Sequence, residues 1–163
     1  MKLRELKLTD ANRMLQWMHD DQVVDKLQKD FKSKTLEDCK YFIANSINKN
    51  NVHLAIANDN DDYMGTVSLK NIYNETAEFA IILCSDGMGT GMAIQAMREM
   101  LNIGKNKYGI KKILWYVAKD NIRALKFYDK NDFSRCDPNM MYVYIKDFIH
   151  SQIDDYIWSM IQY

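Results

Sequence analysis

The chain has 163 residues, 47% of them apolar, and a single proline, Pro138. A chain of this length and composition can bury a proper core, which excludes an intrinsically disordered protein and suits one domain. Its 22 basic and 22 acidic residues cancel, so the general basic surface of a nucleic-acid-binding protein is excluded as well. We therefore expect a single domain over residues 1–163 and no nucleic-acid partner.

The segment MKLRELKLTD at the N-terminus has no apolar signal core, and no apolar stretch approaches the roughly 18 residues that cross a bilayer. The cysteines lie apart without a C-x-x-C pair, as in a protein with reduced thiols: Cys39, Cys84 and Cys136. The histidines also lack metal-ligand spacing: His19, His53 and His150. These features predict a cytoplasmic protein with no membrane partner and no metal ion.

The first elements predicted along the chain are a strand and two helices. Lys2–Leu8 has the pattern of a strand, and Thr9 can cap a helix whose apolar face is Ala11, Met14, Leu15 and Met18. Thr35 opens a second helix, with Asp38 at the position where a capping box places Glu or Gln. Residues with helical spacing then follow: Cys39, Phe42, Ile43, Ser46 and Ile47.

Three strands with short connections come next. Val52–Ala57 and Tyr63–Lys70 are joined by the polar turn NDNDD, and residues 71–76 turn into the strand Ala77–Cys84. Strands joined by short turns pair in an antiparallel arrangement. The sequence therefore predicts an antiparallel sheet over residues 52–84.

A helix and further strands complete the predicted domain. The helix runs from about Met88 to Lys107 and buries Ala93, Met97, Met100 or Leu101, and Gly104. Ile113–Ala118 is apolar on both faces, as in a strand that is covered on both sides. Because a helical crossover links it to Ala77–Cys84, the two strands should lie parallel. Residues 141–146 and 153–161 are expected to add closing antiparallel strands.

The segment 77–93, AEFAIILCSDGMGTGMA, carries the clearest functional pattern. An apolar strand ends at Ser85-Asp86, glycines follow at the alternate positions 87, 89 and 91, and a helical pattern then begins. A strand, a glycine turn and a helix together direct free backbone N–H groups at an anion. The segment therefore predicts a phosphate-bearing ligand, although a glycine-rich turn that merely joins strand to helix is the simpler alternative.

Two familiar phosphate loops do not fit this spacing. A nucleotide P-loop needs Lys and Ser/Thr after its last glycine, where Met92 and Ala93 stand. A dinucleotide fingerprint starting at Gly87 would need its third glycine at Met92, and it belongs on a first strand rather than in mid-chain. The spacing resembles instead the Gln/Arg-x-x-Gly-x-Gly/Ala pyrophosphate loop of the GCN5-related N-acetyltransferases, the GNAT family, with Asp86 at the Gln/Arg position.

A second segment and the N-terminal segment extend this resemblance over nearly the whole chain. After the strand Ile113–Ala118 come residues in the family's order: Asn121, Ala124, Phe127-Tyr128 and Asp132-Phe133 in place of Gly-Phe. The segment LTDANRMLQWMHDDQVVDKL is similar to the opening helices of the RimJ/RimL-type and amino-sugar branches. The resemblance implies a single α/β domain with about four helices. Its mixed sheet of six or seven strands would splay between Ala77–Cys84 and Lys112–Ala118.

The resemblance also implies acetyl-CoA as co-substrate. Its pantetheine arm would pair with the backbone of Ile82 and Leu83, and Asn121 and Phe127 would contact the cofactor as well. Its pyrophosphate would lie on the loop Gly87, Met88, Gly89, Thr90, Gly91 and Met92. Asp86 departs from the family pattern, because a carboxylate is unfavourable beside a pyrophosphate unless it points to solvent or caps the helix.

The chemistry of acetyl transfer needs a donor for the thioester oxygen, a proton for the leaving thiolate and a neutral amine. By resemblance, a backbone N–H near Leu83 serves the oxygen and Tyr128 serves the thiolate; the alternative for Tyr128 is an ordinary buried tyrosine. Glu78 is the candidate base, because it shares a strand face with Ala80 and Ile82, where burial would suit it to proton removal. Its alternative is a solvated residue at the start of a strand.

The predicted function is transfer of an acetyl group from acetyl-CoA to a primary amine by direct attack on the thioester. The predicted acceptor is an amino sugar or its nucleotide-linked form, because Lys29, Lys32 and Lys34 surround Phe31 and could meet a diphosphate and a sugar ring. The alternatives are a protein N-terminal acetyltransferase and a non-catalytic CoA-binding protein. A homodimer is possible, since aromatic residues gather near the C-terminus: Tyr142, Tyr144, Tyr156 and Trp158.

Overall fold

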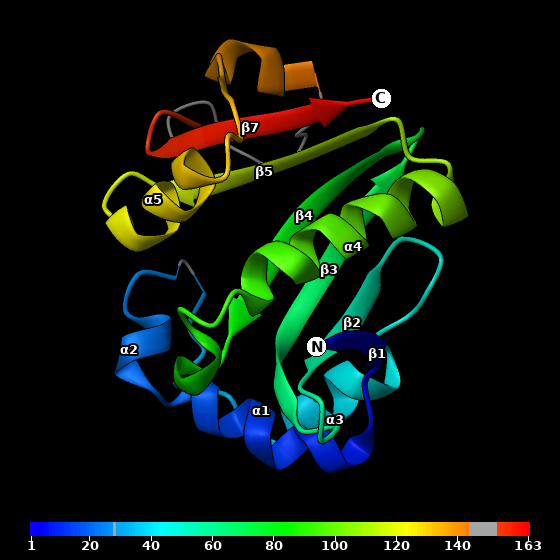
Figure 1. Ribbon diagram of the computed structural model, residues 1–163, viewed down its shortest axis with the longest axis vertical. Coiled ribbons are helices and arrows are strands. Elements are labelled where there is room, and N and C mark those ends of the chain that lie inside the picture. The colour runs from blue at the N-terminus through cyan, green and yellow to red at the C-terminus, as the bar shows by residue number, and fades with distance from the viewer. Residues whose placement is uncertain (28, 144–152) are drawn as a thin grey trace.

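The computed structural model describes residues 1–27, 29–143 and 153–163. In this part of the chain a seven-stranded mixed sheet has the order β1-β2-β3-β4-β5-β7-β6 (Figure 1). Its strands are β1 (Lys2–Glu5), β2 (Val52–Ala57), β3 (Tyr63–Tyr73), β4 (Thr76–Leu83), β5 (Lys112–Ala118), β6 (Arg135–Cys136) and β7 (Tyr156–Gln162). The α-helices are α1 (Ala11–Met18), α2 (Asp21–Val24), α3 (Leu36–Ala44), α4 (Met92–Tyr108) and α5 (Ile122–Lys130). The predicted single α/β domain with a splayed mixed sheet is confirmed.

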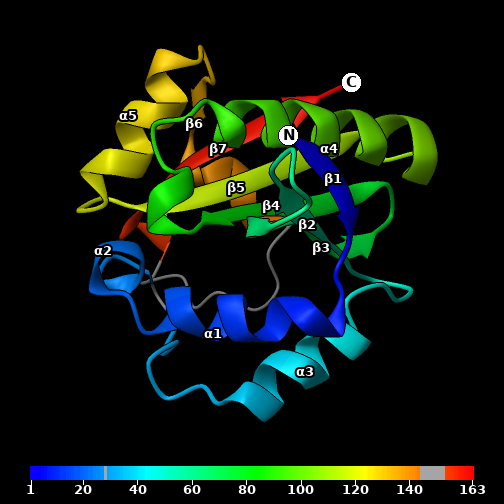
Figure 2. The same cartoon turned by 60° about the horizontal axis from the view of Figure 1, so that its bottom comes forward.

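The helices cover the sheet on both faces. α4 lies on one face and α1 and α3 lie on the other, as Figure 2 shows from below. The α4 face holds the larger core, into which Met97 and Met100 of α4 and Tyr128 of α5 pack. A Cβ at Gly104 would lie 2.9 Å from a Leu69 methyl carbon, so glycine at this position lets α4 approach the sheet closely.

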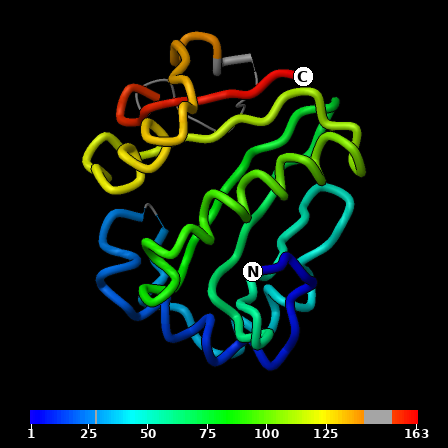
Figure 3. Tube along the Cα trace, in the orientation of Figure 1, coloured from blue at the N-terminus to red at the C-terminus, as the bar shows by residue number. Residues whose placement is uncertain are grey.

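The two parallel strands β4 and β5 stay paired only over their first residues. The pairing runs from Thr76 opposite Lys112 to Glu78 opposite Leu114. β4 continues beside β3 as far as Leu83 opposite Gly65, while β5 continues beside β7 as far as Ala118 opposite Tyr156. The two traces consequently separate from Phe79 onward, and we call this opening the fork (Figure 3).

Several predicted boundaries needed correction. The first strand ends at Glu5, and Leu8–Asp10 form a 3-10 turn that leads into α1. Residues 138–143 form another 3-10 turn, so the strand predicted at 141–146 is wrong over 141–143, and its other residues lie outside the described chain. The glycine loop extends further than predicted, because α4 starts at Met92 after Gly91 in a left-handed conformation.

The aromatic residues near the C-terminus lie partly inside the fold. Trp158 is buried and donates from Nε1 to the Ile153 carbonyl, and Tyr156 packs against Tyr116 with ring centroids 5.1 Å apart. The side chains of Tyr142 and Tyr144 lie outside the described residues. The possible homodimer therefore stays a prediction. Over the residues that the structure describes, no helix is long and apolar enough to span a membrane.

Candidate active site

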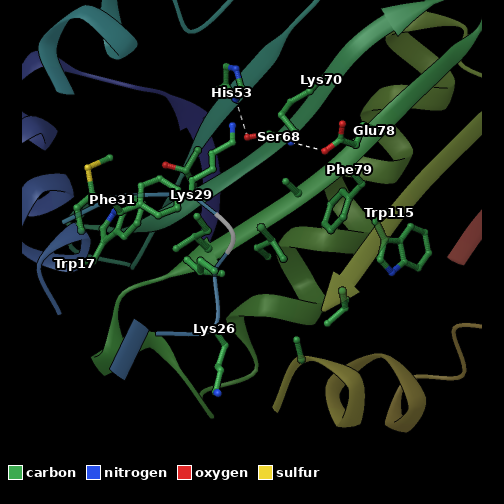
Figure 4. A pocket seen from close by; sticks show the side chains of 18 of the residues that line it. Trp17, Lys26, Lys29, Phe31, His53, Ser68, Lys70, Glu78, Phe79 and Trp115 are labelled. Atoms are coloured by element: carbon green, nitrogen blue, oxygen red, sulfur yellow. Dashed lines mark hydrogen bonds and ion pairs between the residues drawn. The ribbon is translucent and has the colours of Figure 1, made fainter. Parts of the chain in front are cut away.

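A cavity of about 550 Å³ joins the fork to the space beneath α1 and α3. Its fork end is lined from β4, β5 and α5 by Phe79, Ile81, Trp115, Val117, Ala118, Asn121, Ala124 and Tyr128. Its other end, which we call the polar end, is lined by residues of α1, segment 26–34, α3, β2, β3 and β4 (Figure 4). Among them are Trp17, Phe31, His53, Ser68, Lys70 and Glu78.

The glycine loop at the start of α4 has the geometry of an anion site. Gly89 and Gly91 have φ of 77° and 86°, a left-handed conformation that favours glycine. A Cβ at either position would meet no protein atom within 4 Å, so the space in front of the loop is open to a ligand. Among the described residues, the amides of Gly89, Thr90 and Gly91 have no hydrogen-bond partner, and α4 has no acidic residue in its first turn. Free amides and a helix N-terminus at one place fit a pyrophosphate.

The first amides of the predicted loop are already used by the turn. Gly87 N–H donates to the Cys84 carbonyl and Met88 N–H donates to the Ser85 carbonyl. The Thr90 hydroxyl donates to the Gly87 carbonyl at 2.7 Å and holds the loop in shape. The amides at 89–91 are thus the part of the predicted cradle that is open to a ligand.

Two arginines from other elements flank the loop. Asp86 forms an ion pair with Arg13 of α1, so its charge is compensated by a residue far away in sequence. Arg123 of α5 donates to the Gln22 carbonyl at 2.8 Å, and its Nη1 lies 3.1 Å from Met88 Sδ. The pairing of Asp86 with Arg13 removes much of the electrostatic conflict that the sequence implied.

The helix α5 brings its N-cap residue Asn121 and, from its last turn, Tyr128 to the fork. Asn121 is 8% exposed, and its side chain caps α5 by accepting from the Ala124 N–H. Tyr128 packs against Trp115 with ring centroids 5.4 Å apart, and burial raises its pKa, so it is a neutral hydroxyl at physiological pH. No described residue hydrogen bonds to that hydroxyl. Phe127 is half-buried behind Tyr128 and does not line the cavity.

The predicted contacts on β4 fall on the two faces of the strand. Ile82 lines the cavity, whereas Leu83 points into the core under α4. Both belong to the part of β4 that has separated from β5. On the β5 side, the backbone edge of Ile82 and Leu83 therefore has no strand partner among the described residues. This is the edge with which the pantetheine arm was predicted to pair.

Glu78 lies where β4 and β5 still pair, and its carboxylate is heavily bonded. It forms an ion pair with Lys70, and Oε2 accepts from the Asn71 amide at 3.1 Å. A hydrogen bond also links it to Tyr116, and the pKa of Tyr116 is raised by burial and by this carboxylate. The structure therefore shows a paired acid at the position where the sequence suggested a buried base.

The polar end also holds His53 and Lys70, which sequence patterns did not mark, beside Lys29 of the predicted acceptor segment. His53 Nδ1 lies 2.7 Å from Ser68 Oγ, and its ring packs on Phe42 with centroids 4.7 Å apart. Burial and the charges of Lys70 and Lys29 lower the pKa of His53 to about 4. Burial and Lys70 likewise lower the pKa of Lys29, which has no carboxylate within ion-pair distance among the described residues. In the sequence, the only indication of His53 was that it is the one polar residue of the apolar strand Val52–Ala57.

The predicted acceptor segment is divided by the structure. Phe31 lines the cavity and packs on Trp17 with ring centroids 5.0 Å apart, and Lys29 and Lys34 line it as well. Lys32 is outside the cavity lining and forms ion pairs with Asp21 and Asp25. No group of three or more metal-ligating side chains occurs within residues 1–27, 29–143 and 153–163.

Comparison with known proteins identifies the family. The model described as acetyltransferase (GNAT) domain matches residues 1–134. Acetyltransferase PseH of Campylobacter jejuni is 26% identical over 104 residues, which are 64% of this chain and 65% of that relative, slightly less than two thirds of its length. The chain belongs to the GNAT acetyltransferase family, because the family model covers most of it.

Solved structures agree with this fold. Spermidine N-acetyltransferase from Vibrio cholerae in complex with CoA and spermine has a TM-score of 0.79 at 18% identity, over 99% of this chain and 94% of that chain. PaiA N-acetyltransferase from Thermoplasma acidophilum in complex with coenzyme A has a TM-score of 0.72 at 19% identity, over 99% and 98%. The GNAT acetyltransferase family predicted from the sequence is thereby confirmed, and both of these solved structures are complexes with coenzyme A.

Proposed function

We propose that this chain transfers the acetyl group of acetyl-CoA to the primary amine of a small acceptor that carries negative charge. An amino sugar linked to a nucleoside diphosphate has this chemistry. The observation that carries the proposal is the charge of the cavity wall, which contains four lysines against two carboxylates: Lys26, Lys29, Lys34 and Lys70 against Asp38 and Glu78. An excess of lysines attracts an anion and repels a polycation.

The aromatic residues of the polar end support a ring-shaped acceptor. Trp17 is fixed by a hydrogen bond from its Nε1 to the Tyr63 hydroxyl at 3.0 Å, and Phe31 packs against it. Aromatic faces give a sugar or base ring an apolar surface, and the neighbouring lysines give a phosphate its partners. A polyamine such as the spermine bound by the Vibrio cholerae enzyme would meet Lys29 and Lys70, and the Glu78 carboxylate is already paired with Lys70.

In this proposal the loop amides at 89–91 and the α4 N-terminus hold the pyrophosphate of acetyl-CoA. The open backbone edge at Ile82 and Leu83 pairs with the pantetheine arm of acetyl-CoA, which supplies an activated acetyl group. Asn121 and Phe127 support the fork end of the cavity. Tyr128 gives a proton to the leaving sulfur. The sequence predicted Glu78 as the base, but Lys70 and Asn71 already bond to its carboxylate, so the proposed function does not depend on Glu78.

Thiol release from acetyl-CoA with a matched acceptor series tests the proposal. The series contains a nucleotide-linked amino sugar, the free amino sugar, spermidine and a short peptide with a free N-terminus. We expect the nucleotide-linked amine to give the highest kcat/KM. Release with the peptide alone would favour the N-terminal acetyltransferase, and silence with every amine would favour the non-catalytic CoA-binding protein.

A pair of lysine variants separates charge at the cavity from charge nearby. Lys29→Met should raise the KM for the anionic acceptor about tenfold, as loss of one charge-assisted contact does. Lys32→Met removes the same charge three residues away, outside the cavity, and should change that KM less than twofold. Equal effects of the two substitutions would refute the assignment of Lys29 to the acceptor.

A further inference from the structure

One row of side chains crosses the sheet at the level of the fork. His53 on β2 lies opposite Ser68 on β3, and Ser68 lies opposite Ala80 on β4. Two strand spacings amount to about 10 Å. All three residues line the cavity, and Figure 4 shows the bond between His53 and Ser68 on its wall. The row therefore runs from the half-buried imidazole of His53 on β2 to Ala80 on β4, the strand that borders the fork.

The neighbouring row contains the acid predicted from the sequence, and it lies in a less useful place. Lys70 lies opposite Glu78, and Glu78 lies opposite Leu114, so β4 is still closed against β5 at this level. A thioester that enters between separated strands therefore reaches Ala80 before it reaches Glu78. The Glu78 carboxylate is also bonded to Lys70 and Asn71, whereas the Ser68 hydroxyl is bonded to His53.

We propose that Ser68 and His53 form the proton relay of this enzyme, in which Ser68 contacts the acceptor amine and passes its proton to His53. The proposal rests on the proposed function, because it needs an amine in the polar end. Ser68 is 6% exposed and faces the cavity, so a ligand there can replace water at its hydroxyl. In the tautomer with a proton on Nε2, His53 accepts from Ser68 at Nδ1.

The step balances in atoms and charge. The amine nitrogen bonds to the acetyl carbon, and the carbon–sulfur bond breaks with its electron pair on sulfur, which takes the Tyr128 proton. The proton lost by nitrogen goes to the Ser68 oxygen as the Ser68 proton goes to His53 Nδ1. The positive charge on His53 and the negative charge on Tyr128 then cancel through proton exchange with water.

The charges around His53 make this relay depend on the acceptor. The charged groups that face it are Lys29 and Lys34 from segment 29–34, Asp38 from α3, Lys70 from β3 and Glu78 from β4. Lys29 and Lys70 disfavour a proton on His53 while the cavity holds no anion. A phosphate bound beside these two lysines would offset their charge and make His53 a stronger base.

Two measurements test the relay, one of them without turnover. His53→Gln and Ser68→Ala should each lower kcat about 100-fold, and the double variant should be no slower than either, since the residues act as one unit. His19→Gln, a histidine outside the cavity, should stay within twofold of the wild type. In ¹⁵N NMR the His53 ring should titrate at higher pH when uridine diphosphate is added, and this shift should shrink in Lys29→Met.

The outcomes separate the relay from the acceptor. Turnover of His53→Gln and Ser68→Ala within twofold of the wild type, with a large loss in Glu78→Gln, would overturn the relay and support the carboxylate. An unchanged His53 titration with bound uridine diphosphate would also count against it. A third outcome is that another amine is acetylated, that sugar nucleotides give no thiol release, and that turnover still depends on His53. The proposed acceptor class would then be wrong, and the relay would be supported.

Discussion

The fork end and the polar end of the cavity are built from different parts of the polypeptide. The fork end, taken together with the glycine loop at the start of α4, offers backbone: free amides at 89–91, a helix N-terminus and the strand edge that β4 exposes after Glu78. The polar end offers side chains, with Lys29, His53 and Ser68 brought together from three separate segments. A backbone site depends on chain geometry, whereas a side-chain site changes with single substitutions. The first should therefore define the co-substrate and the second the acceptor.

Loss of the Tyr128 hydroxyl is expected to produce the largest effect at the fork end. Tyr128→Phe should lower kcat by about 10²–10⁴-fold, the usual contribution of a general acid, and leave CoA affinity within twofold. Stability should change little, because no described residue bonds to the hydroxyl and none loses a partner. Stopped-flow thiol release and calorimetry with CoA measure the two quantities.

The control for this substitution is Tyr108→Phe, which removes a hydroxyl at the end of α4 outside the cavity lining. Its turnover should match the wild type. Wild-type turnover in Tyr128→Phe itself would reduce Tyr128 to a packing partner of Trp115.

A charged side chain in the glycine loop is expected to have the next largest effect. Gly89→Glu places a carboxylate where the loop is open, and it strains a backbone with φ of 77°. CoA affinity should fall tenfold or more, which is about 1.4 kcal/mol. Gly109→Glu is the matched control, because Gly109 has φ of 64° at the other end of α4 and lies away from the loop.

Calorimetric titration with CoA compares the two variants. The Gly109 variant should share the loss of stability and keep its CoA affinity. If Gly89→Glu binds CoA like the wild type and is folded, the loop does not hold the pyrophosphate, and the backbone character of the fork end would have to be reconsidered.

The difference between the backbone features of the fork end and the side chains of the polar end also explains what the sequence could predict. The spacing of three glycines predicted the loop, and the crossover predicted that β4 and β5 are parallel, while the fork between them was implied by the resemblance to the family. His53 and Ser68 escaped, because they meet only through strand register, and the predicted Lys29 reaches them only through the fold. The three lysines of residues 29–34 were all predicted to meet the acceptor, but Lys32 pairs with Asp21 and Asp25 instead.

One further miss has the same physical origin, whereas one local expectation held and another local prediction failed. The pairing of Asp86 with Arg13 joins residues 73 positions apart, so the loop alone looked electrostatically unfavourable. Asp38 does complete a capping box with Thr35, although Glu or Gln is the usual residue there. The strand predicted at 141–146 failed over Met141, Tyr142 and Val143, because these residues continue the 3-10 turn that begins at Pro138.

The polar end should also affect stability as the pH changes. The pKa of His53 is about 4 in the fold, below its ordinary value of 6.5, so the unfolded chain takes up a proton that the folded chain refuses. Stability therefore falls as the pH drops from about 6.5 to about 4, and the loss is complete below that window. Thermal melts at closely spaced pH values should show this slope in the wild type and a shallower one in His53→Gln. Identical slopes would mean that His53 is not held neutral by the fold.

The smallest expected effect concerns Asp86, the residue of the loop that does not fit the family pattern. Asp86→Gln removes a carboxylate near the pyrophosphate site and breaks an exposed ion pair with Arg13, and such a pair contributes only about 0–1 kcal/mol. CoA affinity should therefore stay equal or become tighter, within about threefold. Arg13→Met should do the opposite, because it leaves the Asp86 carboxylate uncompensated beside the loop.

The double variant Arg13→Met with Asp86→Gln completes the cycle and isolates the coupling between the two side chains. If Arg13 acts only by compensating Asp86, the double variant should recover nearly wild-type CoA affinity in calorimetry. If the double variant stays as weak as Arg13→Met, the guanidinium itself attracts the phosphates, and a side chain of α1 belongs to a site otherwise built from backbone. Clear weakening in Asp86→Gln alone would show that the carboxylate holds the loop in shape. The cycle thus measures how far the fork end depends on side chains at all.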